Sequence, residues 1–101
     1  MTDSTEAMDS EVLRLRSSGR AFARISHELR LERPVDAQRA FQRAVLRLPS
    51  PEQDQVRRQE SSRLDRLAER VNADTDKPLE DRTRRLAAIE RLRGLLAADP
   101  S

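Results

Sequence analysis

Several residue types that carry chemistry are missing or rare in this chain of 101 residues. It has no cysteine, one histidine (His27), two phenylalanines, and neither tryptophan nor tyrosine. Without thiols the sequence offers no disulfide, no thiolate nucleophile and no cysteine-based zinc site, and one histidine cannot build a histidine cluster. We therefore expect neither a cofactor nor a metal site, and we expect His27 to be exposed.

Arrangements typical of catalysis are missing as well. The sequence contains no glycine-rich phosphate loop and no paired carboxylates in an apolar setting, and the serines at positions 17, 18, 61 and 62 have no histidine nearby. The acids of residues 72–78 lack the spacing and the glycine of an EF-hand calcium loop. We predict that the protein is not an enzyme and assign no catalytic residue.

No apolar run is long enough to span a membrane, and residues 1–6 lack the basic and apolar parts of a secretory signal. We expect no membrane partner and a cytoplasmic location, with association to the nucleoid if the protein binds DNA.

The chain is poor in glycine and rich in Arg, Leu, Ala and Glu, which favours helices over strands. We predict an all-α fold with a three-helix unit over residues 9–48 and a two-helix hairpin over residues 52–98. A disordered acidic tail, residues 1–8, precedes them, and Asp9 or Ser10 caps the first helix. Pro49 and Pro51 make residues 49–51 a hinge, with Ser50 capping the next helix.

Charge is unevenly distributed along the chain. The net charge is +2, but residues 1–11 carry −4, residues 12–48 carry +6 and residues 49–101 are neutral. A basic segment favours an anionic partner such as nucleic acid, because neutralising phosphates supplies most of the sequence-independent affinity. The alternative is that Arg is simply the common surface cation here, since 19 of the 20 basic residues of the chain are arginines and they predominate in the neutral half too.

Residues 20–48 read as two helices joined by a turn, with Pro34 at the first position of the second helix. On a helical wheel of about 100° per residue, the second helix buries a stripe of four residues and turns a long-armed polar face outward. The predicted buried stripe is Ala37, Phe41, Ala44 and Leu48. We expect Phe22 and Phe41 to lie in the core with apolar residues of the first helix.

The spacing of Gly19, Phe22, Ile25, Ser26, Leu29 and Leu31, followed by a polar, Arg-rich helix, resembles the helix-turn-helix of bacterial and phage DNA-binding proteins. The resemblance covers residues 12–48 and is of an actinobacterial type. A weaker similarity to small terminase subunits lies in residues 60–67. The family commonly has glycine where this chain has Arg30, so either the turn is strained or it lies nearer Glu32.

The resemblance implies double-stranded DNA as the partner, with the second helix in the major groove. Arg39, Gln42 and Arg43 would reach base edges or phosphates, flanked by Gln38, and Val35 would touch a thymine methyl group. Further contacts to the DNA backbone would come from Arg20, Arg24 and Arg33. The role would be transcription regulation or nucleoid- or phage-type DNA binding.

The hairpin has an apolar seam, with Leu79 and Leu86 seven residues apart, that suits either packing within one chain or contact with a second copy. We expect a homodimer formed through these C-terminal helices. The alternative function is a protein interaction module, in which the same helix pair docks on RNA polymerase or another protein.

Overall fold

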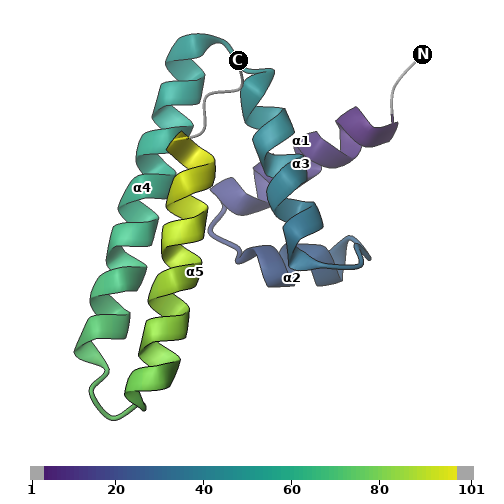
Figure 1. The fold of residues 1–101 in the computed structure, drawn as a ribbon. Coiled ribbons are helices and arrows are strands. Elements are labelled where there is room, and N and C mark those ends of the chain that lie inside the picture. Colours follow the sequence, from purple (N-terminus) through teal and green to yellow (C-terminus); the bar gives the residue numbers. More distant parts are fainter. Residues whose placement is uncertain (1–3, 98–101) are drawn as a thin grey trace. The chain divides into compact units, whose positions relative to one another are not determined.

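The computed structural model describes residues 4–97, and within them the chain is all-α. Figure 1 shows helices joined by short turns, with no strand in the described part. The helices are α1 (Ser4–Ser17), α2 (Phe22–Glu28), α3 (Pro34–Leu46), α4 (Ser50–Ala73) and α5 (Leu79–Ala97). No helix in this part is long and apolar enough to cross a membrane. The chain divides into two compact units, Met1–Gln53 and Asp54–Ser101.

The first helix begins earlier than predicted. We placed residues 1–8 in a disordered tail, but residues 4–8 are the first part of α1, and residues 1–3 lie outside the described region. Residues 4–8 contain no glycine or proline, and Glu6 in the first turn suits the positive end of the helix dipole. Asp9 is consequently not a cap. It lies inside the helix and is fully buried.

The C-terminal ends of α1 and α2 have the same hydrogen-bond pattern. After α1, the Gly19 N–H donates to the Arg16 carbonyl (2.9 Å) and the Arg20 N–H to the Leu15 carbonyl (3.3 Å). This pair of bonds is a Schellman motif, which needs a positive φ at one residue. Gly19 supplies it with φ 104°.

Arg30 takes the corresponding position after α2. Its N–H donates to the His27 carbonyl (3.3 Å), and the Leu31 N–H donates to the Ser26 carbonyl (2.8 Å). Arg30 has φ 58°, so an L-residue occupies the left-handed region that glycine favours. Of the two turns left open by the sequence, the chain therefore adopts the strained one at Arg30, and α2 ends at Glu28.

The core of the first unit lies between α1, α2 and α3. Phe22 and Phe41 are buried, as predicted, and their rings meet edge to face with centroids 5.6 Å apart. The Arg16 guanidinium lies 3.9 Å from the Phe22 ring centroid, close enough for a cation–π interaction. Ala37, Phe41 and Ala44 are buried, as predicted, and Ala40 and Val45 are buried with them, whereas Leu48 is only half-buried.

The starts of α3 and α4 both use proline. Pro34 is at the first position of α3, as predicted, and the Asp36 carboxylate accepts from the Arg33 backbone N–H (3.1 Å). α4 begins at Ser50, so this serine is part of the helix and not its predicted cap. The Pro49 carbonyl accepts from the first free N–H groups instead, and a proline at position 51 is tolerated because its missing N–H had no helical partner there.

In the second unit, α4 and α5 run antiparallel (Figure 1). Leu64 of α4 and Ile89 of α5 are buried, and Arg93 Nη1 donates to Asp65 Oδ1 across the pair (2.6 Å). Leu79, expected in the apolar seam, is 71% exposed because it is the first residue of α5, beside the turn.

Candidate nucleic-acid interface

The outward face of α3 carries the residues predicted to read DNA. Its burial pattern follows the helical period: Ala37, Ala40, Phe41 and Ala44 are buried, while Arg39 is exposed and Val35, Gln38 and Gln42 are half-buried. On the wheel, Val35, Arg39, Gln42 and Leu46 lie within about 40° of the direction opposite Ala37. These four residues are the outer face of α3. They combine one cation and one amide with two apolar side chains.

Arg43 lies at the edge of this face and is tied to α1. Its Nε donates to Asp9 Oδ2 (2.9 Å) and its Nη2 to Asp9 Oδ1 (2.8 Å). Arg47 adds a third bond from Nη1 to Asp9 Oδ2 (2.9 Å). The carboxylate is fully buried while both arginine side chains remain nearly half exposed. Arg43 therefore fastens α3 to α1, and only its remaining N–H groups can face a ligand.

The two arginines also set the protonation of Asp9. Burial by itself raises the pKa of a carboxyl group, but the hydrogen bonds and positive charge of Arg43 and Arg47 outweigh this effect. The pKa of Asp9 consequently lies below its ordinary value of 3.8. The carboxylate is ionised at neutral pH, so the cluster keeps a charge of +1.

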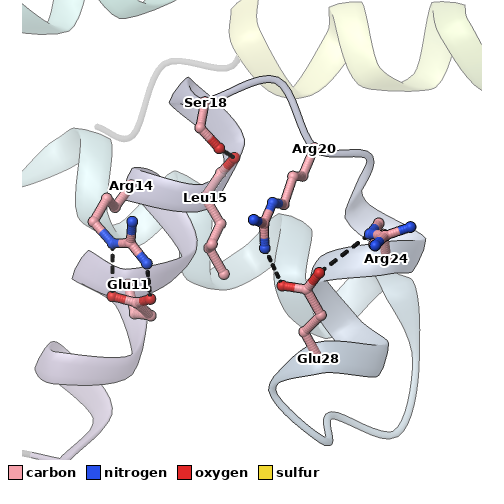
Figure 2. Close-up of polar contacts among 7 residues, drawn as sticks. All are labelled: Glu11, Arg14, Leu15, Ser18, Arg20, Arg24 and Glu28. Carbon is pink, nitrogen blue, oxygen red and sulfur yellow. Dashed lines mark hydrogen bonds and ion pairs between the residues drawn. The ribbon is translucent and has the colours of Figure 1, made fainter.

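The two arginines predicted near α2 share one carboxylate. Figure 2 shows Arg20 and Arg24 reaching Glu28 from opposite sides. Arg24 Nε lies 3.2 Å from Glu28 Oε1, and Arg20 Nη1 pairs with the other oxygen. All three side chains are partly solvent-exposed, so these pairs stabilise the fold by little and can exchange for phosphate contacts.

The remaining predicted cations differ in their partners. Arg33, at the N-cap of α3, lies 3.5 Å from Asp36 Oδ1 and is mostly exposed. Arg39 forms no ion pair within residues 4–97, and neither does Arg30 in the preceding turn. Sequence reasoning did not assign a role to Arg30. The sequence feature that could have indicated a role is that Arg30 occupies a turn position where glycine is favoured. Arg30 is therefore an exposed cation just before α3.

The predicted residues thus fall into two groups. One is the cluster of Arg24 and Glu28 on α2 with Arg20 from the turn before it, and the other follows α3 from Arg33 to Arg43. The acids of the first unit pair with most of its arginines. The positive electrostatic potential of this unit is therefore weaker than the number of its basic residues implies. Arg30 and Arg39 are exposed cations that have no ion pair in the described part of the first unit.

No protein-family model, curated protein or solved structure matches this chain. The assignment of a function therefore depends on the geometry and charge of these residues.

Proposed function

We propose that the protein binds double-stranded DNA, with α2 and α3 acting as a helix-turn-helix and α3 entering the major groove. The observation that carries this proposal is Arg39, an exposed arginine at the centre of the outer face of α3 that forms no ion pair with any described residue. Gln42 follows it on the same face. Arg can bind guanine through two hydrogen bonds and Gln can do the same with adenine.

The other cations have supporting roles in this proposal. Arg20, Arg24 and Arg33 bind backbone phosphates, which position the helix without reading sequence. Binding exchanges their exposed pairs with Glu28 and Asp36 for phosphate oxygens. Arg43 is held by Asp9 and sets the orientation of α3. The protein would regulate transcription or organise phage or nucleoid DNA, as the sequence resemblance implies.

The test is fluorescence anisotropy of a labelled duplex of about 30 base pairs titrated with the protein and with Arg39→Ala. Arg91→Ala is the matched control, because Arg91 is exposed on α5 and forms no ion pair within the described residues. We expect Arg39→Ala to weaken binding by about tenfold, whereas the control changes it little. Equal affinities of the three proteins would remove Arg39 from the interface.

A second function is favoured by the apolar members of the same face. Leu46 is 38% exposed and Val35 is half-buried on the outer face of α3, beside Arg39. An exposed apolar pair beside a cation also suits docking on RNA polymerase or another protein. Leu46→Ser separates the two functions: DNA affinity stays unchanged if the leucine serves a protein partner.

We also propose that the active form is a homodimer joined through α4 and α5. A single helix-turn-helix gives few contacts, and two copies would read two half-sites. Leu95 of α5 is 37% exposed and available for such a contact. Sedimentation equilibrium of the full chain measures this directly, and a monomer at the concentration that binds DNA would contradict it.

A further inference from the structure

The second unit contains a pocket beside the turn between α4 and α5, and its lining includes none of the residues proposed to bind DNA. Its volume is about 230 Å³. The walls carry four basic side chains from α4, the turn and α5: Arg70, Lys77, Arg82 and Arg85.

These four cations are not neutralised by ion pairs within the described residues. Asp74 is the one acid lining the pocket, and none of the four basic residues forms an ion pair within residues 4–97. Other arginines of the same helix behave differently, since Arg84 pairs with Asp81 (3.0 Å) and Arg93 with Asp65 (2.6 Å). The pocket therefore gathers an uncompensated positive charge in a unit whose sequence is otherwise balanced.

One donor in the wall also lacks an acceptor. Arg82 Nε is shielded from solvent and has no hydrogen-bond partner in the described part of the chain. This atom is too shielded for an anion in the pocket to reach it. An anion there would instead contact the exposed side chains of Arg70, Lys77 and Arg85 and would offset the mutual repulsion of the four cations.

We propose that this pocket binds a phosphate group. Planar guanidinium groups match the oxygens of phosphate, and three arginines around one concavity allow several charge-assisted hydrogen bonds. The pocket is smaller than the roughly 300–1,000 Å³ typical of sites for drug-sized ligands, which suits a phosphate or diphosphate group. Leu67 and Val71 form its apolar part and would contact a non-polar portion next to the phosphate.

The phosphate can belong to a small molecule or to a nucleic-acid backbone. The experiment therefore uses two probes, pyrophosphate and a DNA duplex. The full chain is titrated with pyrophosphate at about 0.1 M salt, where the Debye length is about 10 Å and distant charges are screened. The readout is the NMR signal of the arginine Nε–Hε groups, with Arg82 assigned through its substitution. An unlabelled duplex is then added to the complex.

Two double variants with the same change of charge provide the comparison. Arg82→Gln with Arg85→Gln removes two pocket cations, whereas Arg84→Gln with Arg91→Gln removes two cations of α5 outside the pocket. Helical circular dichroism checks that both variants fold.

We expect saturable binding that shifts the Arg82 signal, and a loss of about tenfold or more in affinity for the pocket variant only. If the duplex displaces pyrophosphate, the ligand is a phosphate of the nucleic-acid backbone. If the pyrophosphate-induced shift of the Arg82 signal persists, the ligand is a small phosphate-containing molecule. Absence of saturable binding to the wild-type chain would overturn the proposal, as would an equal loss in both double variants. The wild-type titration alone decides the matter if a variant does not fold.

Discussion

Arg43 of α3 holds the fully buried carboxylate of Asp9 in α1 through two hydrogen bonds, of 2.9 and 2.8 Å. The two residues are 34 positions apart in the chain, so this contact fixes how α3 packs on α1. Arg43 lies on the polar side of α3, and the sequence resemblance predicts that it contacts DNA. Its structural role means that a substitution there changes the fold as well as the proposed interface.

Arg43→Ala should lower the free energy of unfolding of the first unit by about 2 kcal/mol, because Asp9 stays buried and keeps only its bond from Arg47. Urea denaturation followed by circular dichroism measures the change. Arg39→Ala is the matched control on the same helix, and we expect it to alter stability by less than about 0.5 kcal/mol. Equal stability of the two variants would show that the Asp9 contact does not hold the helices.

The stability of the protein should fall at acid pH through Asp9. Its pKa is lowered in the folded state, so its contribution is complete above the unfolded value of 3.8 and is lost as pH falls through the lower folded pKa. Asp9→Asn should therefore flatten the decline in unfolding free energy below pH 3.8. The pKa of Glu11 is also lowered, by its hydrogen bond from Arg14, and Glu11→Gln serves as the comparison. Identical acid profiles for Asp9→Asn and the wild type would contradict this role.

Substitutions at the turns after α1 and α2 should have opposite effects on stability, because one turn needs glycine and has it while the other needs glycine and has arginine. Arg30→Gly should stabilise the protein by about 0.5–1 kcal/mol, since φ 58° is unfavourable for an L-residue. Gly19→Ala should destabilise it by about 1 kcal/mol, because φ is 104° there and a Cβ would otherwise meet no neighbour. Thermal unfolding of both variants checks the pair, and a fall in melting temperature for Arg30→Gly would refute the argument.

Local signals in the sequence predicted much of the secondary structure. Pro34 marked the start of α3, and the periodic apolar residues identified Phe22 and Phe41 as core. The turn at Arg30 was one of two open alternatives, because the sequence could not weigh backbone strain against the hydrogen bonds of the Schellman motif. The early start of α1 was missed because residues 4–8 have no apolar period.

The partners of charged residues were not predictable from the sequence. Asp9 looked like a helix cap, and only the packing of α1 on α3 brings it to Arg43 and Arg47. The phosphate-sized pocket was missed for the same reason. Its cations lie on two helices and a turn, and only the antiparallel arrangement of α4 and α5 gathers them.

Glu28→Gln should strengthen DNA binding. The carboxylate occupies Arg20 and Arg24, so its removal frees both guanidinium groups for phosphates. We expect an increase in affinity of several-fold, on the order of one added phosphate contact, measured by anisotropy at low salt. Glu80→Gln on α5 changes the net charge equally and is the control. Equal gains in both variants would show that only net charge matters.

The salt dependence of DNA binding by the wild-type chain tests the central claim most directly. If Arg20, Arg24 and Arg33 neutralise three phosphates, the logarithm of the binding constant should fall with the logarithm of salt concentration with a slope of about −2.7 or steeper. Anisotropy of a labelled duplex at several salt concentrations measures that slope. Absence of binding at low salt, or a slope near zero, would contradict the account and leave a protein partner for the outer face of α3.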